Sequence, residues 1–134
     1  MTIDAGTQIP ELRVTVDPQA MKPFALLLRD PNPIHLDPDV VAELGLGDRV
    51  INQGPLNAAY VWEAIRVWLG DDALVRRLDL RFTSNAFAGE ALVAGGRVEE
   101  VHAASAELRC TVWLRREDGT DVLTGTASVV VGGE

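Results

Sequence analysis

A carboxylate and an imidazole lie five residues apart in the segment Asp30-Pro31-Asn32-Pro33-Ile34-His35. The two prolines fix their own φ angles and push the residues before them toward extended conformations, so we expect a rigid loop rather than a helix. General acid–base catalysis needs such rigidity, because a displacement of about 1 Å can lower a rate about a hundredfold. The segment therefore predicts that Asp30 and His35 form a pair that moves protons.

A second candidate for chemistry is Gln53-Gly54-Pro55, which opens a long apolar segment. Proline is common at the first position of a helix, so we expect a helix to begin here. The first N–H groups of a helix have no acceptor within it and lie at the positive end of its dipole. Glycine also lets a carbonyl oxygen approach the backbone closely. The N–H of Gly54 is therefore predicted to form an oxyanion site.

The main element that must position these groups is the helix expected over residues 55–69, which Gly70 ends. Its only polar residues are Asn57, Glu63 and Arg66, so we expect it to be buried on most sides. It is too short to span a bilayer. Glu63 and Arg66 share one face, and Glu63 therefore has two interpretations: an ion pair with Arg66, or a general base on the central helix.

Two shorter helices are predicted on either side of the loop. Asp17 followed by Pro18 is typical of a helix start, and this helix must end near Asp30 because prolines follow. A second short helix is expected over residues 38–44, where Gly45 ends it. The loop therefore lies between two helices that fix its ends.

Five segments alternate apolar and polar side chains with a period of two, which is typical of strands with one buried face. They are residues 12–16, 77–83, 92–101, 106–115 and 122–131. Asp118-Gly119 predicts a hairpin between the last two. Consecutive hairpins give an antiparallel sheet, whose inner face the long apolar helix must cover. The sequence therefore predicts an α+β fold with one buried helix on an antiparallel sheet.

The composition limits the class of protein. The length of 134 residues predicts one domain over residues 1–134. The formal net charge of −8, from 20 acidic and 12 basic residues, argues against a partner that is a nucleic acid. We find neither a membrane-spanning run nor a signal peptide in the sequence. The single cysteine, Cys110, excludes an internal disulfide framework and alternates with apolar residues, so we expect a buried thiol in a cytoplasmic protein.

These motifs resemble those of the MaoC-like (R)-specific enoyl-CoA hydratases and dehydratases. The resemblance rests first on residues 30–35 with Asp37 after them, and it extends over about residues 12–131. The order of parts also matches: a helix, the loop, and then the central helix. Further matches are the segments Val50-Ile51-Asn52-Gln53-Gly54, Leu80-Arg81-Phe82 and Ala88-Gly89-Glu90. The resemblance implies a single hot-dog domain, in which a curved antiparallel sheet wraps around one long central helix.

The resemblance also implies a reaction in acyl-CoA and lipid metabolism: reversible hydration of a trans-2-enoyl thioester to a (3R)-3-hydroxyacyl thioester. Asp30 and His35 would together activate one water, and the Gly54 N–H would polarise the thioester carbonyl. Asn32 and Gln53 would position the loop or the substrate. No metal and no cofactor are required, since the CoA thioester is itself the substrate.

A CoA thioester brings phosphate groups to an acidic protein, so cations must be placed locally. Lys22 is the only lysine, and the remaining basic residues are arginines, which bind phosphate bidentately. The candidates for binding these phosphates are Arg76, Arg77 and Arg81, on the strand after the central helix. Leu28-Arg29 replaces the small residues that usually precede the aspartate in this family, which bears on the size of the substrate.

The sequence leaves several alternatives open. Glu63 could make the chain an acyl thioesterase, or the chain could act as one subunit of a heteromeric hydratase with a second hot-dog chain. One sheet over one helix leaves an open edge and apolar surface, so a homodimer or higher oligomer is expected. The acyl group (short-chain, fatty, polyketide or steroid-derived), the carrier (CoA or an acyl carrier protein) and the physiological direction stay open.

Overall fold

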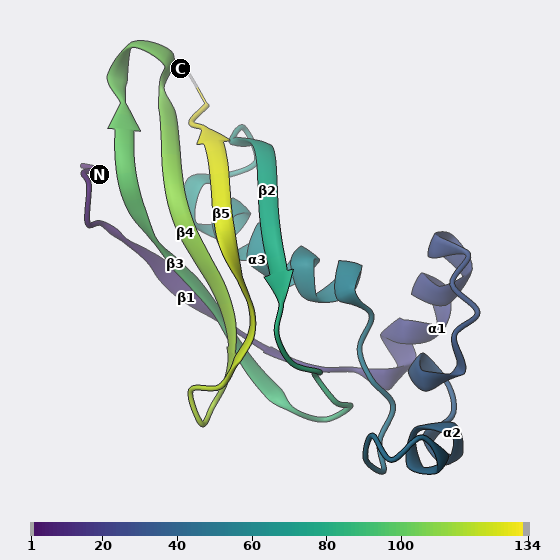
Figure 1. The fold of residues 1–134 in the computed structure, drawn as a ribbon. Helices are drawn as coiled ribbons and strands as arrows, with labels where there is room; N and C mark the ends of the chain where they lie inside the picture. Colours follow the sequence, from purple (N-terminus) through teal and green to yellow (C-terminus); the bar gives the residue numbers. More distant parts are fainter. Residues whose placement is uncertain (1, 133–134) are drawn as a thin grey trace.

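The computed structural model describes residues 2–132, which form a five-stranded antiparallel sheet and three α-helices (Figure 1). The strand order across the sheet is β1-β3-β4-β5-β2. Along the chain the elements are β1 (Gln8–Thr15), α1 (Pro18–Leu28), α2 (Pro38–Glu43), α3 (Gly54–Leu69), β2 (Leu74–Phe82), β3 (Ala91–His102), β4 (Glu107–Arg116) and β5 (Asp121–Val130). All five expected strands are present, although β1 and β2 begin earlier than their alternation predicted.

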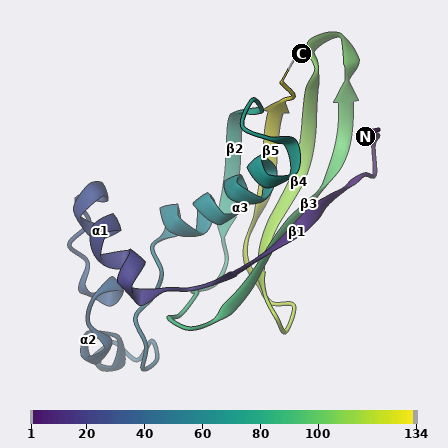
Figure 2. The same cartoon turned by 180° about the vertical axis from the view of Figure 1, so that it is seen from behind.

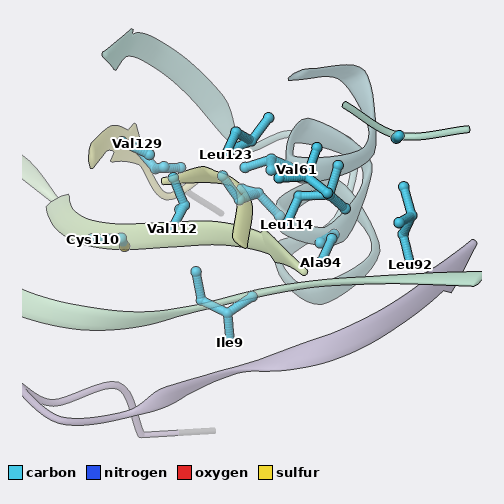
Figure 3. Close-up of a cluster of buried hydrophobic side chains, with 14 of the residues drawn as sticks. Ile9, Val61, Leu92, Ala94, Cys110, Val112, Leu114, Leu123 and Val129 are labelled. Atoms are coloured by element: carbon cyan, nitrogen blue, oxygen red, sulfur yellow. The ribbon is translucent and has the colours of Figure 1, made fainter. Parts of the chain in front are cut away.

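The core lies between the sheet and α3. In β4 the side chains of Leu108, Cys110, Val112 and Leu114 are buried while their neighbours are more exposed, as the alternation predicted. Figure 3 shows Cys110, Val112 and Leu114 meeting side chains of β3, β5 and α3 in one apolar cluster, to which Leu108 also belongs. Burial of this apolar surface is the main force that holds the helix against the sheet.

Helix α3 lies across one face of the curved sheet, which wraps around it (Figure 2). Its buried side includes Leu56, Val61 and Ile65. The opposite side is open, however, with Trp62 52% and Val67 60% exposed. The expectation that this helix is buried on most sides therefore does not hold for the single chain, because one sheet can cover only one side of a helix.

The two edges of the sheet are β1 and β2. In β1 the pairing with β3 shifts between Ile9 and Leu12, which places a bulge at Pro10 and Glu11. In β2 the pairing with β5 runs from Leu74 to Phe82, with one shift between Val75 and Arg77. The outer edge of β2 faces no other described strand.

Helices α1 and α2 project beyond the N-terminal end of α3, away from most of the sheet (Figure 1). Both begin as predicted: the side chains of Asp17 and Asp37 accept hydrogen bonds from the backbone of Gln19 and Asp39, respectively. Such caps satisfy N–H groups that the helix itself leaves unpaired. Arg29, the residue after α1, caps its C-terminal end with a positive φ of 52°.

The loop between α1 and α2 corrects one prediction. Residues 30–35 are not extended throughout, because Pro33–His35 form one turn of 3₁₀ helix. The Asn32 side chain caps this turn by accepting a hydrogen bond from the Ile34 N–H at 3.2 Å. Proline is compatible with the first position of a helix, so Pro33 starts the turn rather than preventing it.

No helix within residues 2–132 is both long enough and apolar enough to cross a membrane.

Candidate active site

The imidazole of His35 is held in one orientation by the backbone. Its Nδ1 lies 2.6 Å from the carbonyl oxygen of Ile51, and the residue is only 8% exposed. A carbonyl oxygen can only accept, so Nδ1 carries the proton and Nε2 is the free acceptor of the neutral ring. Nε2 lies 3.3 Å from Oδ2 of Asp30. The loop therefore brings the two predicted residues into contact.

Asp30 is fixed at its backbone but remains open at its carboxylate. Its N–H donates to the carbonyl of Ala25 at 2.9 Å, which ties it to the end of α1. Its Oδ1 accepts a hydrogen bond from the N–H of Asn32 at 3.1 Å, and its side chain is 37% exposed. One carboxylate oxygen thus stabilises the loop, and the other faces His35. A water bound at this contact would meet two proton acceptors.

The start of α3 carries an unpaired donor. The N–H groups of Leu56 and Asn57 both donate to the carbonyl of Gln53 at 3.1 Å. Pro55 has no N–H, and no acceptor within the described residues takes the N–H of Gly54. A methyl group added at Gly54 would lie 3.4 Å from the ring of Phe82, so this end of β2 borders the same place.

Gln53 connects this helix to α1. It is completely buried, and its Nε2 donates to the carbonyl of Met21 at 2.8 Å. Its Oε1 has no hydrogen-bond partner among the described residues. Gln53 therefore fixes α1, which carries the loop, relative to the N-terminus of α3.

Sequence reasoning missed a buried polar group beside this point. Asn52 Nδ2 donates to Oδ1 of Asn57 at 2.7 Å and lies 3.4 Å from the Tyr60 hydroxyl. Burial raises the pKa of Tyr60 above its usual value. The residue types alone did not predict this contact, because Asn52 and Asn57 meet only once the helix has formed. The bond from His35 to the Ile51 carbonyl was missed because a backbone carbonyl is present at every residue.

Two cavities border the Asp30–His35 contact. His35 lines a cavity of about 380 Å³ together with Lys22, Leu36 and Arg49, among others. Asp30 lines a second, of about 450 Å³, with Lys22, Arg29 and Leu36. Gly54 lines neither of them. In the single chain, the Asp30–His35 contact and the N-terminus of α3 thus do not share either of these two cavities.

The three arginines proposed for phosphate lie along β2 and are exposed. Arg77 forms an ion pair with Asp79 at 2.6 Å and lines a cavity with His102 and Arg109. That cavity contains neither Asp30 nor His35. Within one chain, therefore, the structure does not bring Arg77 to the acid–base pair.

Glu63 is tied to its neighbour on the helix. Arg66 donates to both of its carboxylate oxygens, at 2.8 and 2.7 Å, and Arg66 also pairs with Asp71 at 2.5 Å. The hydrogen bonds from Arg66 hold the pKa of Glu63 below its usual value. A lowered pKa makes a carboxylate a weaker base, and of the two interpretations the geometry favours the ion pair.

Among residues 2–132 no three His, Cys, Asp or Glu side chains converge as a metal site.

Comparison with known proteins identifies the fold. The structure superimposes on R-hydratase PhaJ1 from Pseudomonas aeruginosa with a TM-score of 0.89 and 25% identity, covering 98% of this chain and 84% of that one. The (R)-hydratase of A. caviae involved in PHA biosynthesis gives 0.89 and 24%, covering 97% and 98%. The ChsH1-ChsH2 complex from Mycobacterium tuberculosis gives 0.84 and 25%, covering 98% and 99%.

These structural neighbours share the curved sheet and long helix of the hot-dog fold. No curated protein matches the chain. The model of the MaoC like domain, however, matches residues 4–114, which include the loop, α3 and most of the sheet. The chain therefore belongs to the MaoC-like dehydratase family.

Proposed function

We propose that the chain catalyses the reversible hydration of a trans-2-enoyl thioester to a (3R)-3-hydroxyacyl thioester. The observation that carries this proposal is the 3.3 Å contact between His35 Nε2 and Asp30 Oδ2 in a chain of the MaoC-like family. The similarity to R-hydratase PhaJ1, at 25% identity, supports both the reaction class and the R configuration.

In the proposed mechanism, one water binds beside the contact between Asp30 and His35, within hydrogen-bond reach of both side chains. Its oxygen adds to the β-carbon of the enoyl group, and the pair returns a proton to the α-carbon. Nε2 of His35 can accept a proton because Nδ1–H is held by the Ile51 carbonyl. The Gly54 N–H, at the positive end of the α3 dipole, donates to the thioester oxygen as negative charge develops there. Dehydration is the same path in reverse.

The decisive experiment follows loss of the enoyl thioester absorbance with crotonyl-CoA and longer enoyl-CoA substrates. We expect the wild type to hydrate at least one of them, and chiral analysis to give the R alcohol. Asp30→Asn should lower kcat by a factor of about 100 to 10,000, because it removes one of the two proton acceptors. Asp39→Asn, an exposed carboxylate in α2, is the matched control. An inactive wild type across all chain lengths would contradict the proposal.

The thioesterase alternative can be separated in the same assay. A thiol reagent detects free CoA, which hydrolysis releases and hydration does not. The pairing of Glu63 with Arg66 opposes a role for Glu63 as a base. We therefore expect no CoA release, and Glu63→Gln to retain wild-type hydration.

We propose that the active form is a homodimer built on the outer edge of β2. An antiparallel pairing centred on Leu78 would place Leu74 of each copy opposite Phe82 of the other. These two side chains are 56% and 52% exposed in the single chain. The same pairing places Arg77 opposite Asp79, so the interface is complementary in charge as well as in apolar surface.

The homodimer also bears on the predicted phosphate site. Phe82 lies beside Gly54, so Leu74 of the second copy, with Arg76 and Arg77 after it, would lie near the N-terminus of α3. We expect Arg76→Gln to raise KM for an enoyl-CoA and to leave KM for the corresponding pantetheine thioester, which lacks the phosphates, unchanged. A partner hot-dog chain of another sequence, as in the ChsH1-ChsH2 complex, is the alternative. If hydration requires a second polypeptide, the homodimer is wrong.

A further inference from the structure

The segment after β2 is fixed by an ion pair from a distant part of the chain. Glu90 Oε1 accepts a hydrogen bond from the Phe87 N–H at 2.6 Å. Its Oε2 lies 3.1 Å from Nε of Arg116, at the end of β4, in an ion pair whose angle is not that of a hydrogen bond. The two side chains are only 18% and 22% exposed. Charges in such a largely buried place are costly unless they are paired. Separating Glu90 from Arg116 is therefore unfavourable, and the two side chains hold each other in place.

Arginines also hold the aromatic ring and the backbone of this segment. The ring of Phe87 lies 5.7 Å from the guanidinium of Arg49 and 5.9 Å from that of Arg116. Arg49 donates to the carbonyl of Ala88 at 3.0 Å, and Arg116 donates to the carbonyl of Asn85. Residues 85–88 are therefore anchored through both side chains and main chain.

This anchored segment forms a short antiparallel bridge with residues 50–52. The Asn52 N–H donates to the carbonyl of Ala86 at 2.8 Å, and the Ala88 N–H donates to the carbonyl of Val50 at 2.9 Å. Because peptide groups alternate in direction along an extended chain, those of Ile51 point the other way, toward the catalytic loop. The Ile51 N–H donates to the carbonyl of Ile34 at 2.9 Å, and the Ile51 carbonyl accepts from His35.

We propose that Glu90 and Arg116 are positioning residues that fix the Nδ1–H form of His35 through the Phe87–Ile51 bridge. Neither touches the site of reaction. Together they hold Phe87, Phe87 is paired with Ile51, and the Ile51 carbonyl selects which ring nitrogen carries the proton. The consequence of this positioning for catalysis rests on the proposed hydratase function. The effect of Glu90 and Arg116 on the imidazole does not.

The direct test is the ¹⁵N chemical shift of the imidazole nitrogens, measured without substrate. The chain has two histidines, so His102→Gln assigns the signals of His35. The spectra are recorded at a pH where the imidazole is neutral, because a protonated ring beside Asp30 would carry a proton on both nitrogens. We then expect the wild type to show Nδ1–H, and Arg116→Met and Glu90→Gln each to show a mixture of the two neutral forms. The two variants perturb opposite ends of the pair, so a folding defect in one does not remove the test.

The matched control is Arg115→Met. Arg115 is the neighbouring residue of β4 and also forms an ion pair, with Asp121 at 2.8 Å, but it contacts none of residues 85–88 in the hydrogen-bond network described above. It should keep the wild-type imidazole signals. If Arg116→Met and Glu90→Gln keep them too, or if Arg115→Met changes them equally, the proposal is wrong.

Activity supplies a second readout. If the chain is a hydratase, kcat should fall about 10- to 100-fold in Arg116→Met and KM should change less, because the base is displaced while Arg116 itself does not line the cavity at His35. Arg116→Lys keeps the charge beside Glu90 and should recover part of the loss. An inactive wild type with the expected imidazole signals would overturn the proposed function and leave the positioning role intact.

Discussion

At the scale of single residues, Asp30 and His35 differ in how firmly they are held. The imidazole is almost fully buried and bound to a carbonyl at 2.6 Å, whereas the carboxylate is 37% exposed. In the proposed hydration, this difference would let a firmly held His35 act as the base while water enters and substrate leaves beside the more accessible carboxylate. The third group, the Gly54 N–H, belongs to the backbone and can be tested only by changing the space around it.

Gly54→Ala should separate stability from activity. The backbone of Gly54 does not have a positive φ, so alanine should raise the free energy of unfolding by about 0.4–1 kcal/mol. The new methyl group would contact the Phe82 ring and narrow the approach of the thioester oxygen. We therefore expect kcat/KM to fall about tenfold even though the N–H remains. Urea denaturation and hydration kinetics measure the two effects, and a variant as active as the wild type would place the oxyanion elsewhere.

The buried thiol of Cys110 gives a pH-dependent prediction. Burial raises its pKa to about 11, from about 9 in the unfolded chain. Between these values the unfolded chain releases the proton while the folded chain keeps it, so alkali favours unfolding. The free energy of unfolding should fall by about 1.4 kcal/mol per pH unit in this window, relative to Cys110→Ala. Urea denaturation at pH 8 and pH 10.5 checks this, and parallel curves for the two proteins would contradict it.

The sequence was a good guide to which residues to examine but not to their partners. Asp30 and His35 were selected because two prolines make their spacing rigid, and the structure places them in contact. The carbonyl of Ile51 and the pair formed by Glu90 and Arg116 were not foreseen. A backbone carbonyl has no sequence signal, and the pair forms only when the end of β4 meets the turn after β2.

At the scale of elements, the end of α1 contains an unusual backbone conformation. Arg29 has φ 52° and ψ 41°, the left-handed region that glycine usually occupies at a helix end. The residue directly precedes Asp30, so the conformation that ends α1 also sets where the loop of residues 30–35 begins. Arg29 lines the Asp30 cavity, and we expect its side chain to influence which substrates enter.

Arg29→Gly should remove the strain of this conformation. The left-handed region costs an L-residue about 1–2 kcal/mol, partly offset by the greater entropy of unfolded glycine, so we expect a net gain of about 0.5–1 kcal/mol. Arg29→Ala keeps the strain and is the control for loss of the guanidinium. Chemical denaturation of both variants gives the comparison. Equal stability of the two would show that the side chain, not the backbone, determines the effect.

The sequence predicted the ends of elements correctly where a local signal sets them. It failed where strand pairing sets them. The start of α1 was predicted from Asp17-Pro18, and α2 begins at Pro38 as predicted; the aspartates before both helices cap them. The turn Pro33–His35 was wrongly excluded, because proline also fits the start of a short helix. Strand β1 begins at Gln8 rather than residue 12, since its first residues pair with β3 rather than following a regular alternation.

At the scale of the whole molecule, the outer side of α3 and the edge of β2 leave apolar side chains exposed. Trp62 and Val67 lie on the helix, and Leu74 and Phe82 lie on the strand. Scattered exposed apolar residues are ordinary, but Leu74 and Phe82 lie on a free strand edge. When two copies of this edge pair antiparallel, Leu74 of one copy lies opposite Phe82 of the other. This is the surface on which we place the second copy.

Trp62→Glu should therefore dissociate the dimer without unfolding the chain. Trp62 is half exposed in the single chain, so its replacement leaves the core intact. A buried tryptophan at an interface commonly contributes about 2 kcal/mol or more, so we expect the dissociation constant to rise at least about thirtyfold. Light scattering coupled to size exclusion measures the mass. Val101→Glu, 41% exposed at the end of β3, is the control, and a monomeric wild type would refute the assembly.

The bulge in β1 has a consequence for how far such an assembly can grow. A sheet with two free edges could add copies at both ends and lengthen into a fibre. Here the second edge contains Pro10, which has no N–H to offer, and the bulge with Glu11 interrupts the ladder beside it. The edge of β2 is therefore the better site for another strand, and a twofold contact would use that edge in both copies. We therefore expect the proposed assembly to stop at two chains, because Pro10 and the bulge weaken the other edge of the sheet.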